Sequence, residues 1–328
     1  MTTISSIPGL CLILGFLLHT ASGNCQSDSK HHWLDTDGNV INAHGAGVLY
    51  YDSVYYLFGE VKRGSTWLVP GQNWEDYRVP AGGVSCYSSG DFEHWVYRGI
   101  ALTPTTDGSD LDTGMVIERP KVIYNSSTRQ FVMWMHIDSN NYAYARAGVA
   151  VSDRPEGPYH YLGSVRPNGQ MSRDMTLFRD DDGKAYLVYS SENNQTMQVC
   201  LLSPDYLHPT TDYRRILVGR NREAPAMFKN GKTYYLVTSA CTGWSPNAAL
   251  LATAYSPFGP WKEAGNPCAG PGSDSTFGAQ STYIVYLVRD RKYLFMADRW
   301  NKTNLPMSGY LWLPLEIEKK GIVIRNGE

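Results

Sequence analysis

The stretch Glu223-Ala-Pro-Ala-Met-Phe-Lys-Asn-Gly, continued by Lys232-Thr-Tyr-Tyr-Leu-Val, decides the fold of this 328-residue chain. It consists of an apolar run, a turn pair and a second run rich in aromatic and β-branched residues. Asn-Gly between two such runs is a strong signal for a β-hairpin. The sequence therefore predicts a hairpin whose first strand begins at a carboxylate, Glu223.

The same unit occurs five times, each time with an acidic, amide or imidazole residue at its start. The five leading residues are His44, Glu118, Asp174, Glu223 and Gln280, at intervals of 74, 56, 49 and 57 residues. A hairpin that recurs at such spacing is typical of a radial β-repeat. Further strand-like runs lie between the hairpins, and no long stretch has helical periodicity. We therefore expect an all-β, five-bladed β-propeller that forms a single domain over residues 24–328.

In a propeller the first strand of every blade faces the central channel. Equivalent positions on different blades therefore converge, although they lie far apart in the sequence. This brings Glu118, Asp174, Glu223 and Gln280 together around one axis. The repeat thus predicts the location of a polar site as well as a fold.

Composition excludes several classes of partner. The formal net charge is −2 and no basic stripe is present, which argues against a nucleic acid or an anionic membrane as partner. The chain has 23 Tyr and 9 Trp, residues with an apolar face and a polar edge that suit both propeller packing and sugar rings.

The first 23 residues differ from the rest. An apolar segment from Ile7 to Leu18 is followed by the small residues Ala21-Ser-Gly, a pattern typical of a secretory signal peptide. The apolar segment is short for a membrane span, and a Golgi-type membrane anchor is the alternative. We therefore expect a secreted protein that has no membrane association once the leader is removed.

Two kinds of covalent modification, N-glycosylation and disulfide formation, would be consistent with a secreted protein. Asn125-Ser-Ser, Asn194-Gln-Thr and Asn301-Lys-Thr are N-glycosylation sequons, although a glycan on Asn194 would obstruct the expected site. Cys241 and Cys268 are the best candidates for a disulfide, since both are expected in loops of one blade. No cysteine spacing indicates a metal site, and no cofactor motif is present.

The channel-facing carboxylates suggest glycoside hydrolysis, which needs an acid and a second group on opposite sides of the scissile bond. Glu223 begins an apolar strand, where burial would raise its pKa and keep it protonated. Glu118 and Asp174 would tune that pKa and bind sugar hydroxyls. Their neighbours Arg119 and Arg173 are expected to point away, because adjacent strand residues face opposite sides. His44 is more consistent with a structural role than with catalysis.

Several motifs together resemble glycoside hydrolase family 43. They are Glu118-Arg-Pro-Lys-Val-Ile-Tyr, Ser172-Arg-Asp-Met-Thr-Leu-Phe, Arg222-Glu-Ala-Pro-Ala-Met-Phe, Phe277-Gly-Ala-Gln-Ser-Thr-Tyr, Asn42-Ala-His-Gly-Ala-Gly, Tyr56-Leu-Phe-Gly-Glu and Cys241-Thr-Gly-Trp. The branch that matches best is that of the exo-β-1,3-galactanases. The resemblance covers nearly all of the chain after the leader, and it implies a five-bladed propeller and inversion of the anomeric configuration.

The resemblance also implies roles for individual residues. Glu223 corresponds to the general acid, and Glu118 to the carboxylate that modulates its pKa. Most of the family has a general-base Asp on the first blade, where this chain reads Ala43-His-Gly. The galactanase branch also lacks that Asp, and Gln280 matches the glutamine proposed there as the base. Because an amide is a poor base, Gln280 either accepts the proton through an imidic-acid tautomer or only positions the water, while Glu118 or a water chain takes the proton.

Further positions resemble sugar contacts of the family: Glu60, Tyr142, Asp174, Asn193, Thr242 and Trp244. We expect the two carboxylates to bind hydroxyls, and Tyr142 or Trp244 to stack on a ring.

The sequence thus predicts a secreted, monomeric, inverting glycosidase that releases terminal galactose from the polysaccharide β-1,3-galactan, the backbone of arabinogalactan, without a cofactor or metal. Two alternatives stay open: a non-catalytic galactan-binding propeller, and a family-43 enzyme acting on arabinosyl or xylosyl substrates.

Overall fold

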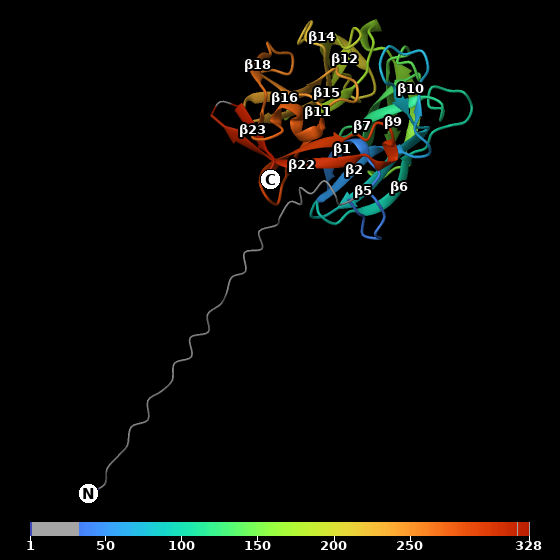
Figure 1. Ribbon diagram of the computed structural model, residues 1–328. Helices are drawn as coiled ribbons and strands as arrows, with labels where there is room; N and C mark the ends of the chain where they lie inside the picture. The colour runs from blue at the N-terminus through green and yellow to red at the C-terminus, as the bar shows by residue number, and fades with distance from the viewer. Residues whose placement is uncertain (2–32, 320, 328) are drawn as a thin grey trace.

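The protein is a five-bladed β-propeller in a computed structural model that describes Met1, residues 33–319 and residues 321–327 (Figure 1). The predicted signal peptide lies outside the described residues, apart from Met1. The helices of the described part are three short 3-10 segments, Pro167–Gly169, Ser273–Gly278 and Leu305–Met307. None of the helices in this part is both long and apolar enough to cross a membrane.

Each blade is an antiparallel sheet of consecutive strands. Blade 1 contains β1 (His44–Tyr51), β2 (Val54–Lys62), β5 (Ala81–Ser89) and β6 (Val96–Leu102). Blade 2 contains β7 (Val116–Asn125), β8 (Gln130–Asp138), β9 (Arg146–Ser152) and β10 (His160–Val165). Blade 3 contains β11 (Met175–Arg179), β12 (Ala185–Ser191), β13 (Thr196–Leu202) and β14 (Pro209–Ile216). Blade 4 contains β15 (Arg222–Asn230), β16 (Thr233–Ala240), β17 (Leu250–Ala254) and β18 (Lys262–Gly265).

Blade 5 has the same meander and one added strand. It contains β20 (Gln280–Leu287), β21 (Lys292–Arg299), β22 (Gly309–Glu318) and β23 (Gly321–Arg325), with β19 (Cys268–Ala269) paired in parallel to β23. A small hairpin, β3 (Trp67–Leu68) with β4 (Tyr77–Arg78), is inserted between β2 and β5 of blade 1.

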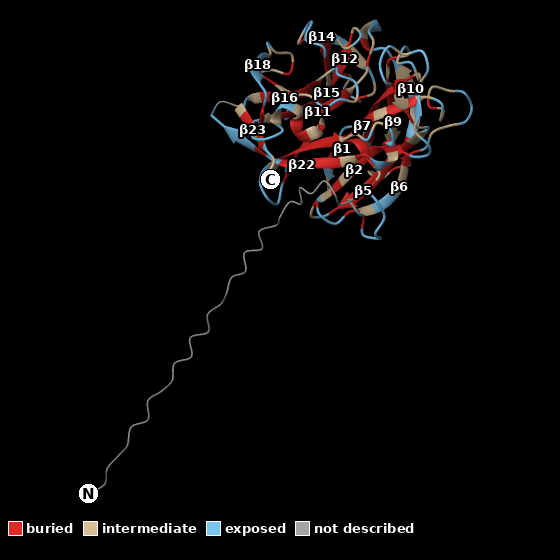
Figure 2. Ribbon diagram, in the orientation of Figure 1, coloured by how far each residue is buried: buried red, intermediate tan, exposed pale blue. Residues whose placement is uncertain are grey.

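The five first strands form a closed ring around the axis. β1 contacts β7, β7 contacts β11, β11 contacts β15, β15 contacts β20, and β20 returns to β1. The predicted hairpins are therefore the inner hairpins of the five blades, and the predicted fold class is confirmed. Figure 2 shows that buried residues dominate the inner strands, whereas outer strands such as β14, β18 and β23 carry exposed residues.

Hydrophobic layers fill the spaces between neighbouring blades. Between blades 5 and 1, Met296 and Trp312 pack with Leu57 and Trp95. Trp33, near the start of the described chain, contacts Trp312 with a ring-centroid distance of 4.1 Å. Blades 1 and 5 share no sheet. The ring is therefore closed by side-chain packing rather than by a blade built from both ends of the described chain.

Three of the five first strands carry a bulge directly after their leading residues. Register shifts follow His44 in β1, Glu118 in β7 and Glu223 in β15. The residue after each of them has a positive φ, which is 55° at Gly45, 55° at Arg119 and 52° at Ala224. A bulge inserts an extra residue and redirects the neighbouring side chains.

This bulge overturns the prediction that Arg119 points away from Glu118 and the channel. Strict alternation does not apply across a bulge, and the Arg119 guanidinium turns inward, 3.0 Å from the Asp174 carboxylate. Arg173 also fails to point away. It lies just before β11, outside any strand, and donates to the Tyr142 carbonyl oxygen at 2.8 Å.

The predicted disulfide is wrong as well. Cys241 and Cys268 are both free thiols. Cys241 follows β16 of blade 4, whereas Cys268 lies in β19 of blade 5. Nothing in the local sequence pattern marks Cys268 as part of a strand that joins the next sheet.

Candidate active site

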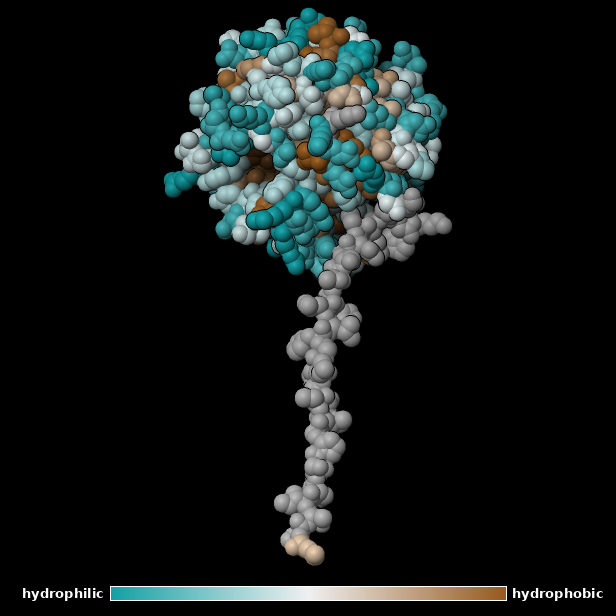
Figure 3. Space-filling model, turned by 90° about the vertical axis from the view of Figure 1, so that its left-hand side faces the viewer, coloured by the Kyte–Doolittle hydropathy of each residue, from teal (hydrophilic) through white to brown (hydrophobic). Residues whose placement is uncertain are grey.

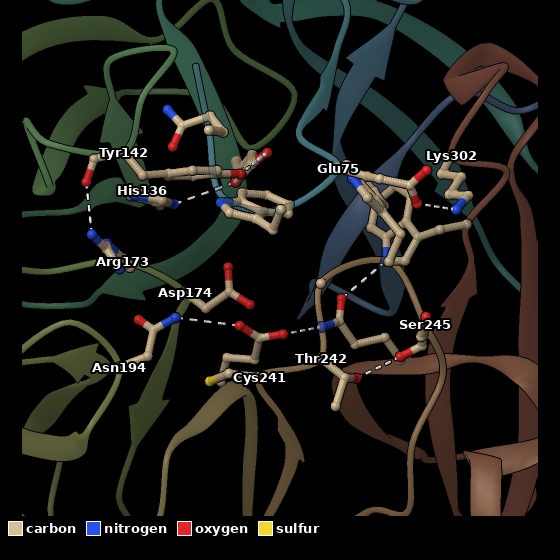
Figure 4. A pocket seen from close by; sticks show the side chains of 18 of the residues that line it. Glu75, His136, Tyr142, Arg173, Asp174, Asn194, Cys241, Thr242, Ser245 and Lys302 are labelled. Carbon is tan, nitrogen blue, oxygen red and sulfur yellow. Dashed lines mark hydrogen bonds and ion pairs between the residues drawn. The ribbon is translucent and has the colours of Figure 1, made fainter. Parts of the chain in front are cut away.

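A cavity of about 750 Å³ opens where the leading residues of the blades converge (Figure 4). All nine residues expected from the sequence line it: Glu60, Glu118, Tyr142, Asp174, Asn193, Glu223, Thr242, Trp244 and Gln280. They come from strands of the blades and from residues next to those strands, and all five blades contribute. His44 is not part of this lining. Its ring is buried, stacks on Tyr310 at 4.9 Å and has Nδ1 3.4 Å from Asp298.

Glu223 lies near the start of β15 in blade 4, and its partners come from blades 3 and 5. Its Oε1 accepts a hydrogen bond from Gln280 Nε2 at 2.9 Å, and its Oε2 accepts one from Asn194 Nδ2 at 3.3 Å. Burial and the nearby charge of Asp174 raise the pKa of Glu223 to about 8, although the charge of Arg119 opposes the shift. At neutral pH the carboxyl group is therefore mostly protonated, as a general acid requires.

Gln280 has its amide group fully occupied. Its Oε1 accepts from Arg119 Nη2 at 2.6 Å and from Trp300 Nε1 at 2.9 Å. Its Nε2 donates to Glu223 Oε1 at 2.9 Å and to Ser239 Oγ at 3.1 Å. An amide has two acceptor lone pairs and two N–H donors, and these four contacts use all of them.

Arg119 connects three blades. From β7 it contacts Gln280 of blade 5, donates to the Ser281 carbonyl oxygen at 3.2 Å and pairs with Asp174 beside blade 3. The Asp174 oxygen that pairs with Arg119 also accepts from the backbone N–H of Ala224 at 3.0 Å. Burial alone would lower the pKa of Arg119, but Asp174 and Asp298 raise it, so the guanidinium stays charged.

Glu118 lies on the blade 2 side of the cavity. The Tyr142 hydroxyl lies 3.1 Å from each of its carboxylate oxygens, and His136 Nδ1 is 3.4 Å from Oε2. Burial pushes the pKa of Glu118 upward, but the contact with His136 and the charge of Lys62 outweigh it and hold that pKa well below its usual range. Glu118 and Glu223 are thus two carboxyl groups in one cavity whose pKa values are pushed apart, which is the arrangement expected for an ionised group and an acid.

His136 is a site residue that the sequence interpretation missed. Its ring is stacked on Tyr142 at 5.7 Å, and its Nε2 lies 2.9 Å from Asp138. Burial alone would lower the pKa of His136, but the contacts with Asp138 and Glu118 raise it to about 9. Within the described chain, Glu118, His136 and Asp174 form a group that could hold a metal ion, with their ligand atoms within 4.8 Å of one another. A protonated imidazole, however, has no lone pair to offer a metal.

Lys62 and Glu60 form an ion pair at the end of β2, with Lys62 Nζ 2.6 Å from Glu60 Oε2. Burial raises the pKa of Glu60, as does the charge of Glu118, whereas Lys62 opposes the rise. Lys62 also lies 5.5 Å from the centre of the Trp300 ring. Sequence reasoning did not identify Lys62 or Trp300, because neither belongs to the recurring hairpin motif.

The loop residues at the cavity differ from one another in the groups that they contact. Asn194, rather than its neighbour Asn193, contacts Glu223, and Figure 4 shows Asn194 directed toward the centre of the cavity. Asn193 is exposed and accepts from Arg173 at 3.3 Å. Thr242 donates to the Ser245 carbonyl oxygen at 2.6 Å. Tyr142 is one of the two residues expected to stack on a sugar, the other being Trp244, and its ring contacts His136 and the Arg78 guanidinium.

The hairpin inserted in blade 1 forms part of the cavity wall. Its residue Glu75 pairs with Lys302 of the loop after β21, at the edge of the cavity in Figure 4. Its Trp74 lies against Gly243 of the loop after β16, where a Cβ atom would be 3.4 Å from the indole. The hairpin therefore reaches loops of blades 4 and 5.

Comparison with known proteins gives one family. The family described as glycosyl hydrolases family 43 matches residues 46–293. No curated protein matches the chain. Among solved structures, a family 43 β-1,3-galactosidase solved with galactodeoxynojirimycin is 43% identical with a TM-score of 0.84, and the match covers 90% of this chain and 97% of that one.

Two further solved structures are similar over the same part of the chain. An exo-β-1,3-galactanase from Phanerochaete chrysosporium, solved with galactose, is 36% identical with a TM-score of 0.80, and the match covers 90% of this chain and 65% of that one. An exo-β-1,3-galactanase from Clostridium thermocellum is 36% identical with a TM-score of 0.79, covering 90% and 64%. This chain thus matches about two thirds of the length of these two proteins. The resemblance expected from the motifs is confirmed: the chain belongs to glycosyl hydrolase family 43 and is a glycoside hydrolase.

Proposed function

We propose that this enzyme is an exo-acting β-1,3-galactanase that removes terminal galactose from β-1,3-galactan with inversion. The observation that carries the proposal is the cavity in which protonated Glu223 faces the same space as ionised Glu118. The similar structures named above are β-1,3-galactosidases and exo-β-1,3-galactanases, which supports galactan as the substrate class.

In the proposed reaction, Glu223 donates its proton to the oxygen of the leaving sugar as the bond from that oxygen to the anomeric carbon breaks. A water attacks the anomeric carbon from the opposite face, which inverts its configuration. The water's proton passes to a chain of waters or to ionised Glu118, whose depressed pKa makes it a weak base. Inverting enzymes hold their two groups about 6.5–9.5 Å apart to leave room for this water.

Unpaired polar atoms in the cavity support a hydroxyl-rich ligand. Asn194 Oδ1 and Trp244 Nε1 are buried and have no hydrogen-bond partner among the described residues. Burying such atoms without a partner is costly, whereas sugar hydroxyls would pair with both. Trp244 and Trp300, whose ring centres are 5.6 Å apart, offer aromatic surface beside these atoms, and Glu60 and Asp174 offer carboxylates for further hydroxyls.

The proposal also places the enzyme outside the cell as a monomer, with residues 1–23 as its signal peptide. The face shown in Figure 3 is mainly hydrophilic, with small separate hydrophobic patches. Of the three sequons, Asn301 is exposed, whereas Asn125 is buried and donates to the Pro204 carbonyl oxygen at 2.8 Å. Because Asn194 contacts Glu223, we propose Asn301 as the glycosylated position.

The test is incubation of the purified protein with linear β-1,3-galactan while proton NMR follows the anomer of the sugar released. We expect galactose that appears first as the α-anomer and later equilibrates. First appearance of β-galactose would overturn inversion. Binding without release would favour the non-catalytic galactan-binding alternative, and release from arabinan or xylan alone would overturn the substrate.

A further inference from the structure

The orientation of the Gln280 amide is determined by its neighbours. Arg119 Nη2 and Trp300 Nε1 can only donate, so the group 2.6 Å and 2.9 Å from them must be the amide oxygen. The amide nitrogen therefore faces Glu223 and Ser239, at 2.9 Å and 3.1 Å. Exchanging oxygen and nitrogen would set N–H groups against N–H groups.

This arrangement leaves Gln280 no capacity to accept a proton. Both lone pairs of Oε1 are occupied, one of them by a charged guanidinium. An imidic-acid tautomer would carry its proton on this oxygen, where it would point at two N–H donors. The surroundings therefore stabilise the ordinary amide, whose N–H groups are donors.

We propose that Gln280 is a positioning residue for the acid Glu223 and not the acceptor of the water's proton. This inference rests on the proposed function, in which Glu223 protonates the leaving oxygen. Gln280 Nε2 holds Glu223 Oε1, and the contact strengthens as the carboxyl group loses its proton, because a hydrogen bond to a carboxylate is stronger than one to a neutral acid. Arg119 and Trp300 pull electron density toward Oε1, which makes the N–H a better donor.

A comparison of leaving groups separates a residue that acts through the acid from one that acts on the water. A 2,4-dinitrophenyl leaving group departs as a stable anion and needs no proton, whereas the sugar alkoxide of β-1,3-galactobiose does. We expect Gln280→Ala to lose about 10²-fold or more of kcat on galactobiose, within the usual range for acid catalysis, and less than about tenfold on 2,4-dinitrophenyl β-galactoside. Glu223→Gln should give the same pattern and serves as the reference. An equal loss on both substrates would overturn the proposal.

Gln280→Glu provides a second readout. A carboxylate at this position is a better base than an amide, but it cannot donate to Glu223. We expect its galactobiose activity to fall as in Gln280→Ala, and activity at or above that of the wild type would assign the base to position 280. Trp300→Phe keeps an aromatic ring, although a smaller one, and removes one donor to Oε1, so it should show a smaller loss with the same preference for the activated substrate.

The pH profile gives a third readout, which a merely structural role would not move. Without the N–H donor the anion of Glu223 is less stable, so the basic limb of kcat/KM should move to higher pH in Gln280→Ala. An unmoved limb would contradict the proposal. The wild-type rate on galactobiose tests the proposed function by itself, whereas only the ratios of variant to wild type on the two substrates test Gln280.

Discussion

Glu223→Gln should lower kcat on β-1,3-galactobiose by about 10²- to 10⁴-fold, the usual contribution of a general acid. The glutamine has nearly the same shape but no proton to deliver to the leaving oxygen. The raised pKa of Glu223, about 8, also sets a pH dependence. The wild-type enzyme needs the protonated form, so kcat/KM should be retained below about pH 8 and fall as the pH rises through that value. In the Glu223→Gln variant, kcat/KM should no longer fall as the pH rises through this value.

The matched control is Glu263→Gln, the same chemical change at a position on β18 outside the cavity, where Glu263 pairs with Arg220 on the surface. This variant should keep the wild-type rate and pH profile. Both variants should show the wild-type circular dichroism spectrum. If Glu223→Gln kept more than about a tenth of the wild-type rate on galactobiose, a loss far below the range for an acid catalyst, another group would have to be the acid.

Among the substitutions proposed for this protein, Arg119→Met should lower the free energy of unfolding the most. The Arg119 side chain is buried and pairs with Asp174, and Met would leave that carboxylate without its cation. Removing one partner of a buried pair costs about 3–5 kcal/mol, which urea unfolding would measure. Activity should fall too, because Gln280 loses the donor that holds its oxygen. The charge of Arg119 also lowers the pKa of Glu223, so the basic limb of kcat/KM should move to higher pH.

Arg325→Met is the control for the loss of an arginine. Arg325 is exposed and pairs with Glu316 and Glu318 on the surface, where such pairs contribute little to stability. The Arg325→Met variant should therefore unfold at nearly the same urea concentration as the wild type. Equal stability of the two variants would show that the contacts of Arg119 do not hold the blades together.

The features that recur in the sequence were predictable, because they depend on local patterns. The turn residues and the alternation around Glu118 and Glu223 are sufficient to locate the inner hairpins, and the ring then brings their leading residues together. Glu118, Asp174, Glu223 and Gln280 line the cavity for this reason, whereas the other five expected residues that line it were identified through the family resemblance. The identities of these residues matter less for this result than the repetition of their position.

The remaining features depend on geometry that one sequence does not show. A bulge after Glu118 reverses the direction of Arg119, and nothing in the local pattern marks that extra residue. The contact of Asn194 with Glu223 was not predictable either, because the path of a loop is not periodic. Trp74 belongs to an inserted hairpin without a counterpart in the other blades, so the repeat could not place it at the cavity.

The closure of the ring by contacts between blades that share no sheet has a consequence for chain order. Every blade consists of consecutive residues, and Trp33 near one end of the described chain contacts Trp312 of the last blade. Joining the ends with a linker and opening the loop between β6 and β7 would produce a circular permutant in which each sheet keeps all its strands. Such a chain would begin with blade 2, which carries Glu118, and end with blade 1, which carries Glu60, yet it would place both residues at the same cavity. The order of the blades along the chain therefore does not determine how the residues of the cavity are arranged.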